Sequence, residues 1–437
     1  MILHSTLGKS EKVSFARGIV NGLAPDGGLY LPDTLPRLPK ALFNNIAEMS
    51  AREIGYVVMT TLLGDIIPPT QLKQIVDDAL NFDIPVRTLS DDICSLELFH
   101  GPTMSFNDIG ARFMARLLPL LDPAHGLRRD IILATSGDSG GAVANGFERS
   151  ASTRVVVVYP RRKLSPELIT QFAGRRNVLA IEVDGSFDIC QSLVKQILLE
   201  NAGETGDPRV TSGNSINLLR QLPAIIYYFY GYAAMQARFP ETETVISVPC
   251  GNLGNMTAAL MAKQMGLPVK RFIAANNAND VFVEYLRTGG MRPRRALMTL
   301  ASALDVGNPS NLARIIDMYS GDLTRLRKDV SGVALTDAAI AATMKEAART
   351  ASVILDPQTA AAYGAARREL KPDEKGLIIA STHPAKFRDA VTKVLGEEFA
   401  IPRPVRTSHN SKSQHGYNPV IKIPPTIAAL RRALEIQ

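Results

Sequence analysis

The chain has few cysteines, no long apolar segment and no recognisable leader. Cys94, Cys190 and Cys250 are the only cysteines among 437 residues. Their odd number and wide spacing fit neither a disulfide framework nor a zinc site, so we expect a reducing compartment. The amino-terminal stretch MILHSTLGKSEK lacks the apolar core of a signal peptide. No apolar run reaches the roughly 20 residues that cross a bilayer. These absences predict a cytoplasmic protein with no membrane partner.

Several catalytic and binding signatures are also missing. The six histidines do not form an HExxH motif or another metal-ligand spacing, so no metal site is predicted. A GxSxG elbow is absent as well, which argues against a Ser-His-Asp hydrolase. The net charge is +7, but the basic residues are scattered and form no long run interleaved with aromatics. An ordinary solvated surface or an anionic small ligand explains this charge, and no nucleic-acid partner is predicted.

Apolar residues make up 46% of the sequence, which is enough for more than one core, and 21% charged residues argue against global disorder. Apolar runs rich in β-branched residues recur, and a Gly-rich turn and a helical pattern follow most of them. Such runs lie at 130–134, 154–160, 178–183, 243–249, 270–276 and 376–380. This alternation predicts an α/β fold whose parallel sheets are covered on both faces and carry loop chemistry at the carboxyl ends of their strands.

The domain organisation follows from changes in this pattern. Residues 1–95 are predicted to form an N-terminal mixed unit, with a short strand within 22–36 and helices near 40–65 and 70–82. The sequence IIPPT separates the two helical stretches, because proline cannot continue a helix. Residues 96–210 are predicted to form a smaller α/β domain. Residues 211–437 are predicted to form a larger α/β domain with a C-terminal tail.

Two Gly-rich turns at strand ends are candidate anion sites. Gly251, Asn252, Leu253, Gly254 and Asn255 open a helix after a strand, where glycines allow close backbone approach and free N–H groups favour an anion. An unliganded glycine turn is the alternative. The second turn contains Ser136, Gly137, Asp138 and Ser139, and the alternative there is an ordinary N-cap. Two such turns suit a phosphorylated cofactor and an anionic substrate.

Two further stretches carry candidate polar groups. In NSINLLRQL, helical spacing would place Asn217 and Arg220 on one face near Ser215, as in an oxyanion clamp, although a plain helix start explains the pattern too. In STHPAKF, the polar residues are Ser381, Thr382, His383 and Lys386. A lone histidine before proline is more often a turn residue than a base.

Taken together, the motifs resemble those of bacterial threonine synthase, in the same order along almost the whole chain. They include VSFARGIVNGLAPDGGLYLP, LELFHGPTMSFNDIGARFMA, TSGDSGGAVANGF, YPRRKLSP, NSINLLRQL, SVPCGNLGNMTAAL and HPAKF. The resemblance implies the fold type II architecture of pyridoxal-phosphate enzymes, with open, largely parallel twisted sheets, helices on both faces and an N-terminal mixed α/β unit. Members of that family are lyases that convert O-phosphohomoserine and water to threonine and phosphate, with the cofactor as electron sink.

The resemblance also implies roles for individual residues. The Gly251–Asn255 loop would hold the phosphate of pyridoxal 5'-phosphate, and Ser381 or Thr382 would face its pyridine nitrogen. The turn from Ser136 to Ser139 would meet the carboxylate of a phosphorylated amino-acid substrate. Candidates for the substrate phosphate are Lys163, Ser215, Asn217 and Arg220.

One position departs from the family pattern. Asn107 stands where the family has the lysine that carries the cofactor as a Schiff base. An amide is neither a nucleophile nor a useful base, so any cofactor would be bound non-covalently and standard activity would be lost or reduced. The alternatives are a paralogue acting on a related amino acid in a specialised pathway and a non-catalytic pseudoenzyme or interaction protein. Lys163 or Lys386 could replace the missing amine. Either a monomer or a homodimer fits.

Overall fold

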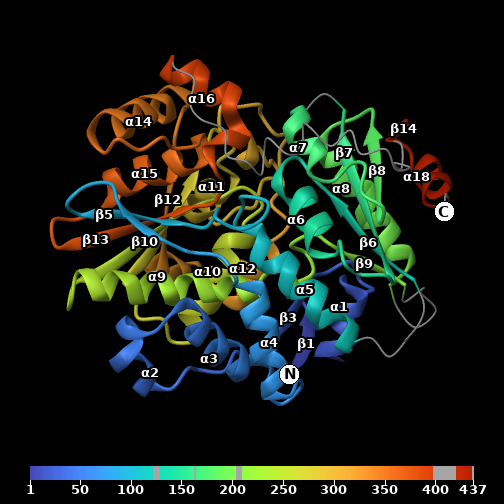
Figure 1. Cartoon of the computed structure of the whole chain (residues 1–437), viewed down its shortest axis with the longest axis horizontal. Helices are drawn as coiled ribbons and strands as arrows, with labels where there is room; N and C mark the ends of the chain where they lie inside the picture. Colours follow the sequence, from blue (N-terminus) through green and yellow to red (C-terminus); the bar gives the residue numbers. More distant parts are fainter. Residues whose placement is uncertain (122–127, 162–163, 203–208, 397–419, 436–437) are drawn as a thin grey trace. The chain divides into compact units, whose positions relative to one another are not determined.

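The computed structural model describes residues 1–121, 128–161, 164–202, 209–396 and 420–435. Contacts within the chain divide it into two compact units. Figure 1 shows its helices and strands, coloured from the N-terminus to the C-terminus. Unit 1 comprises Met1–Thr34, Asn107–Arg220 and Pro402–Gln437, and unit 2 comprises Leu35–Phe106 and Gln221–Ile401. The division into 1–95, 96–210 and 211–437 stays a prediction.

Unit 1 is built on a parallel sheet of five described strands in the order β14-β8-β7-β6-β9. These strands are β6 (Arg129–Ala134), β7 (Thr153–Pro160), β8 (Val178–Val183), β9 (Val210–Ser212) and β14 (Ile421–Ile423). The helices and turns of the unit are α1 (Phe15–Asn21), α5 (Asn107–Leu121), α6 (Asp138–Gly146), α7 (Pro166–Thr170), α8 (Phe187–Glu200), η2 (Leu218–Arg220) and α18 (Ile427–Leu434).

The central strand β7 shows why this sheet is parallel and internal. Its four consecutive valines, Val155 to Val158, are fully buried, so side chains on both faces of the strand are covered. Helices α8 and α18 contribute Leu193, Ile197 and Leu430 to the apolar cluster against the sheet. A small antiparallel sheet in the order β2-β1-β3 completes the unit, with β1 at Ile2–Ser5, β2 at Val13–Ser14 and β3 at Tyr30–Pro32.

Unit 2 contains a sheet of six described strands in the order β12-β11-β10-β13-β5-β4, parallel except for β4. The strands are β4 (Val86–Thr88), β5 (Ile93–Glu97), β10 (Glu243–Pro249), β11 (Arg271–Asn276), β12 (Val330–Ala334) and β13 (Glu374–Ala380). In Figure 1, α15 (Pro357–Glu369) and α14 (Asp337–Thr350) lie above these strands, and α9 (Ile225–Arg238) lies below them. An apolar cluster that includes Ile273, Ile378 and Tyr363 fills the space between the sheet and α14 and α15.

The remaining described elements of unit 2 connect these layers. They are α2 (Lys40–Asn45), η1 (Ile46–Glu48), α3 (Ala51–Leu63), α4 (Pro69–Ala79), η3 (Leu222–Ala224), α10 (Gly254–Gln264), α11 (Val281–Thr288), η4 (Ser302–Leu304), α12 (Leu312–Met318), α13 (Leu323–Asp329), η5 (Pro384–Phe387) and α16 (Arg388–Leu395). None of the helices in the described ranges combines the length and apolar character that a membrane crossing requires.

The α/β fold with parallel, covered sheets is confirmed, and so are the strands and helices predicted around the two Gly-rich turns. The helical stretch expected near 40–65 is divided. Helix α2 ends at Asn45, η1 ends at Glu48, and α3 begins at Ala51. Ser50 accepts a hydrogen bond from the backbone N–H of Glu53, whose carboxylate accepts one from the Ser50 backbone N–H in return. This capping box starts a new helix inside the predicted one.

Candidate functional site

The predicted site residues are distributed over the two units, and each group has its own surroundings. In unit 1, Asn107 is the first residue of α5 and its Oδ1 accepts a hydrogen bond from Arg220 Nη2 at 3.1 Å. Arg220 Nη1 donates to the carbonyl of Gly213 at 2.8 Å. Helix α5 packs closely against the backbone of Arg220: a Cβ added to Gly110 would lie 2.5 Å from the Arg220 carbonyl oxygen. Asn107 is therefore held beside a guanidinium.

Arg220 carries its charge inside unit 1. The side chain is buried, and that burial lowers its pKa to about 10, while the nearby Asp108 carboxylate acts in the opposite direction. A pKa of about 10 still leaves the guanidinium cationic at neutral pH. A desolvated cation attracts an anion more strongly than an exposed one. A charged guanidinium thus lies against the amide of Asn107, with the buried carboxylate of Asp108 nearby.

The segment that contains Asn217 and Arg220 does not begin the helix that the alternative interpretation expected. The segment forms only the 3-10 turn η2, and its side chains have different partners. Asn217 Nδ2 donates to the Ile19 carbonyl at 3.0 Å, and its Oδ1 accepts from the backbone N–H of Leu219 at 3.1 Å. Since the amide is engaged on both sides, Asn217 has a structural role. Ser215, by contrast, is partly exposed.

The turn before α6 is organised by one hydroxyl. Thr135 Oγ1 accepts from the N–H groups of Gly137 and Gly140, both at 3.2 Å, and donates to the Gly137 carbonyl at 3.0 Å. Ser136, Asp138 and Ser139 are partly exposed there. The sequence drew attention to the serines, whereas the residue that shapes the turn is Thr135.

Asn214 is another residue that the sequence did not single out. Its carboxamide pairs with the backbone of Ala134 at the end of β6, accepting from the N–H at 2.8 Å and donating to the carbonyl at 2.7 Å. The Asn214 carboxamide therefore continues the hydrogen bonding of β6 beyond its last residue, next to the turn that Thr135 organises. Lys163, a predicted phosphate contact, lies outside the described residues.

In unit 2, the Gly251–Asn255 loop leads from β10 into α10. No side chain caps this helix, whose N-cap residue Leu253 adopts the left-handed conformation with φ 61°. A Cβ on Gly251 would lie 2.9 Å from the Ala303 carbonyl oxygen and 3.1 Å from Leu304 Cα, so this close approach requires glycine. An uncapped helix start after a tight glycine turn can hold an anion.

Asn255, in the first turn of α10, has one engaged and one unengaged side-chain atom. Its Oδ1 accepts from the hydroxyl of Tyr228 at 2.5 Å. Its Nδ2 is buried and has no hydrogen-bond partner among the described residues. A buried amide donor without a partner is costly, and a ligand oxygen at the loop would satisfy it. Burial raises the pKa of both Tyr228 and the neighbouring Cys250, so neither ionises near neutral pH.

The segment containing Ser381 and Thr382 pairs with residues 105–106, which precede Asn107 in the sequence. The backbone N–H of Phe106 donates to the Ser381 carbonyl at 2.8 Å, and Ser105 forms an isolated antiparallel bridge with Thr382. Both hydroxyl-bearing residues are buried. Lys386 is buried as well, and its Nζ donates to the carbonyl of Thr103 at 2.8 Å. The amine proposed as a replacement for the missing lysine is therefore engaged.

His383 follows this segment and acts as a helix cap. Its Nδ1 accepts from the N–H of Ala385 at 3.1 Å, which requires the neutral ring. Burial, assisted by the nearby charge of His100, lowers the pKa of His383 to about 4. The prediction of a turn residue is confirmed.

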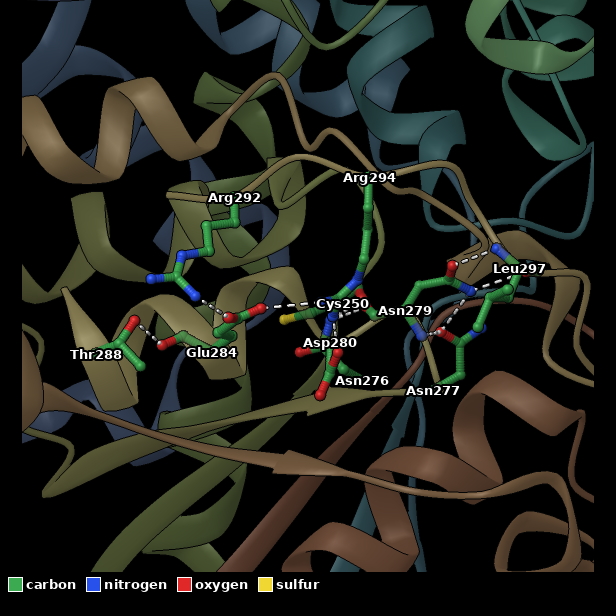
Figure 2. Close-up of polar contacts among 10 residues, drawn as sticks. All are labelled: Cys250, Asn276, Asn277, Asn279, Asp280, Glu284, Thr288, Arg292, Arg294 and Leu297. Carbon is green, nitrogen blue, oxygen red and sulfur yellow. Dashed lines mark hydrogen bonds and ion pairs between the residues drawn. The ribbon is translucent and has the colours of Figure 1, made fainter. Parts of the chain in front are cut away.

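Figure 2 shows a polar network at the carboxyl ends of β10 and β11. Asn276 Nδ2 donates to the Cys250 carbonyl at 3.0 Å and to the Asn279 carbonyl at 3.2 Å. Asn279 exchanges two hydrogen bonds with the backbone of Leu297. Arg294 pairs with Asp280 and Glu284. The network ties the start of the glycine loop to the irregular segment after α11.

Gln358 is a further residue that the sequence analysis did not single out. It lies in the first turn of α15, is 1% exposed, and neither its Nε2 nor its Oε1 has a hydrogen-bond partner among the described residues. No group of three or more His, Cys, Asp or Glu within the described ranges could hold a metal ion.

The class of the protein follows from the fold, the two helix-start turns and the comparison with family models. A model described as "Pyridoxal-phosphate dependent enzyme" matches residues 87–382, and one described as "Threonine synthase N terminus" matches residues 3–80. The chain thus belongs to the pyridoxal-phosphate-dependent enzyme family of fold type II, and its cofactor is pyridoxal phosphate.

Individual relatives narrow the family. The chain is 39% identical over 407 residues to threonine synthase from Serratia marcescens, covering 92% of this chain and 93% of that protein. It is 37% identical over 406 residues to the enzyme from Escherichia coli strain K12, covering 92% and 93%. The chain belongs to the threonine synthase family.

Solved structures agree with this assignment. The crystal structure of threonine synthase from Escherichia coli superposes with a TM-score of 0.90 at 35% identity, covering 99% of both chains. A threonine synthase from Brucella melitensis, solved with PLP bound, gives a TM-score of 0.87 at 28% identity, covering 99% of this chain and 98% of the other. The expected fold type II architecture is confirmed.

Proposed function

We propose that this chain binds pyridoxal 5'-phosphate through the Gly251–Asn255 loop. The observation that carries the proposal is the uncapped start of α10, where Gly251 allows close backbone packing and the Nδ2 of Asn255 lacks a partner among the described residues. Backbone N–H groups and a helix dipole favour a phosphate dianion there. When bound, the cofactor supplies an electron sink for carbanion chemistry.

The other cofactor contact in the proposal is Ser381 or Thr382, facing the pyridine nitrogen. A neutral hydroxyl leaves that nitrogen unprotonated, in contrast to a carboxylate. The bridge between Thr382 and Ser105 and the hydrogen bond from Phe106 to Ser381 fix this segment through its backbone.

The proposed substrate is a phosphorylated amino acid of the O-phosphohomoserine type. In this proposal the turn from Ser136 to Ser139 binds its carboxylate, and Arg220, with Ser215, binds its phosphate. The buried charge of Arg220 supports the assignment, since hydrogen bonds to ionised groups are roughly twice as strong as neutral ones. Asn217 is the weakest member of the set, because its amide is engaged by protein groups. Lys163 stays a prediction.

Asn107 determines what happens after binding. Its amide can accept the hydrogen bond from Arg220 but cannot attach a cofactor covalently or take up a proton. Losing one general base typically slows a reaction on the order of 10²–10⁴-fold. We therefore propose a threonine synthase homologue that holds its cofactor non-covalently and releases phosphate from O-phosphohomoserine slowly. A pseudoenzyme is the limiting case, and a cytoplasmic location and the oligomeric state remain predictions.

The covalent state of the cofactor tests this proposal directly. The protein is loaded with pyridoxal phosphate, treated with borohydride and digested, and labelled lysines are mapped by mass spectrometry. We expect no pyridoxyl label on any lysine and cofactor that is recovered as free pyridoxine phosphate, because borohydride reduces an unattached aldehyde to the alcohol. A pyridoxyl label on Lys386 or Lys163 would show that another amine has replaced the missing one. Failure to retain any cofactor would refute the binding proposal itself.

The variant Asn107→Lys tests whether the rest of the site is intact. A lysine amine beside Arg220 meets like charge, which lowers its pKa and favours the neutral nucleophilic form. We expect a new visible absorbance band, a borohydride-reducible adduct and phosphate release at least about 100-fold faster than in the unmodified chain. Asn107→Met is the matched control, because methionine is about as long as lysine but has no amine. Cofactor binding by Asn107→Lys without adduct or phosphate release would mean that the substrate site has diverged.

A further inference from the structure

Arg314 is the largest fully buried side chain among the described residues, with an exposed fraction of 0%. It belongs to the short helix α12, and its Nη1 donates to Asn311 Oδ1 at 2.9 Å. Burial lowers its pKa to about 9, which still leaves the guanidinium charged at neutral pH. A cation in the interior of a domain is costly unless it has a partner or a task.

The contacts of Asn311 lead from Arg314 to the glycine loop. Asn311 Nδ2 donates to the backbone carbonyl of Asn252 at 3.0 Å. The neighbouring Ser310 donates its backbone N–H to Asn252 Oδ1 at 2.6 Å. Both oxygens of Asn252 are therefore held by one short segment, and Gln221 Nε2 adds a hydrogen bond to Asn311 Oδ1. The conformation of Asn252 depends on a residue more than 50 positions away.

The other side of the loop is equally constrained. A Cβ on Gly251 would touch Ala303 and Leu304, so the backbone of the 303–304 segment packs directly against the loop. The loop is thus confined between this segment and Asn311. Engaging the Asn252 carbonyl with a donor also keeps it from turning its negative end toward an anion at the start of α10. Carbonyl orientation decides whether a backbone turn attracts or repels a phosphate.

We propose that Arg314 is a positioning residue for the phosphate loop, and that through Asn311 and its own charge it makes the chain prefer the phosphorylated cofactor over its dephosphorylated form. The proposal rests on the function proposed above for the Gly251–Asn255 loop. Its mechanism has two parts: the Asn311 contact fixes the Asn252 carbonyl, and the buried guanidinium adds positive potential to that of the α10 start.

A purely structural Arg314 is the competing explanation, and it predicts a different pattern. Loss of packing alone would weaken binding of every ligand by the same factor. Loss of a phosphate-positioning contact would weaken binding of pyridoxal phosphate much more than that of pyridoxal, which has the same ring without the phosphate. The ratio of the two dissociation constants therefore separates the explanations.

The experiment measures both dissociation constants by equilibrium dialysis for the full chain and for Arg314→Met. We expect the ratio of affinities, pyridoxal phosphate over pyridoxal, to fall about 10-fold or more, because the contact that holds Asn311 and the positive potential near the start of α10 are both lost. Arg271→Met is the matched control. Arg271 lies at the opposite, amino end of β11 and pairs with Glu374 and the carbonyl of Glu369, so its loss destabilises unit 2 without touching the loop.

Arg314→Lys keeps the argument testable if the methionine variant does not fold. Lysine retains the charge but loses the planar fork that meets Asn311. We expect a smaller fall in the ratio, about 3-fold or more. An unchanged ratio in the folded variants, or an equal fall in Arg271→Met, would overturn the proposal. A full chain that binds neither ligand, or binds both equally, would instead overturn the proposed role of the loop.

Discussion

The two helix-start turns have the same local pattern and different supports. Each follows a parallel strand and opens a helix, α6 in unit 1 and α10 in unit 2. The first is shaped from within by Thr135, whose hydroxyl accepts from two glycine N–H groups. The second has no side-chain cap and is held from outside by Ala303, Leu304 and Asn311. Two N–H groups of the first turn are thus already satisfied by a hydroxyl of the same turn, whereas no side chain caps α10.

The largest difference between the two turns is expected when a methyl group is added to each. Gly251→Ala places a Cβ within 2.9 Å of the Ala303 carbonyl, so either segment must move. We expect a loss of about 1–3 kcal/mol in the free energy of unfolding. We also expect cofactor affinity to fall at least about 10-fold, since the loop would lose its geometry. Denaturant unfolding and a binding titration measure the two effects.

Gly137→Ala is the matched control in the self-capped turn. No atom lies within 4 Å of the added Cβ, and the backbone φ of 177° is extended, so any residue can adopt it. We expect a change below about 1 kcal/mol, the usual cost of alanine at an N-cap. Equal losses in the two variants would mean that the turns do not differ in tightness.

Lowering the pH should reduce the stability of unit 2 through protonation of His383. Its folded-state pKa of about 4 lies below the unfolded value of about 6.5, so the unfolded chain takes up the proton first. This contribution to stability is complete above pH 6.5 and is lost as the pH falls toward 4. Allowing for the partial exposure of the ring, we expect a loss of about 1–2 kcal/mol between pH 7 and pH 4.5.

His383→Asn tests the origin of this pH dependence. Asparagine also caps helices but does not titrate, so the cap to Ala385 is kept. The difference between variant and unmodified chain in unfolding free energy should shrink as the pH falls from 7 to 4.5. A constant difference would assign the acid sensitivity to other groups, of which Glu97, His100 and Lys386 are the nearest charges.

The smallest expected effect concerns the self-capped turn itself. Thr135→Val keeps the shape of the side chain and removes the acceptor for Gly137 and Gly140, which should cost about 1 kcal/mol in unfolding free energy. Thr257→Val is the control in the other turn, because that hydroxyl only donates to the Leu253 carbonyl in its own helix. If the two variants lose the same stability, Thr135 does not organise its turn.

Particular residues show how far sequence reasoning reached. The strands and helices around both turns were predictable, because apolar runs and glycines act locally. Asn217 and Lys386 were predicted as candidates from their chemistry, yet both donate to backbone carbonyls of Ile19 and Thr103. Thr135 and Asn311 carried no signal in the sequence, since threonine before a turn and asparagine before a helix are common. Hydrogen-bond partners far apart in the chain cannot be inferred from local spacing.

The sequence by itself determined the α/β pattern, the two helix-start turns and the chemistry of Asn107, because periodicity, glycine and an amide nitrogen have the same properties in any fold. Only the tertiary structure decided which polar groups remain for a ligand. It placed Arg220 against Asn107, engaged Asn217 with the backbone, and joined Arg314 to Asn252 through Asn311. These partners meet because packing of the sheets and helices brings distant segments within the 3 Å that a hydrogen bond requires.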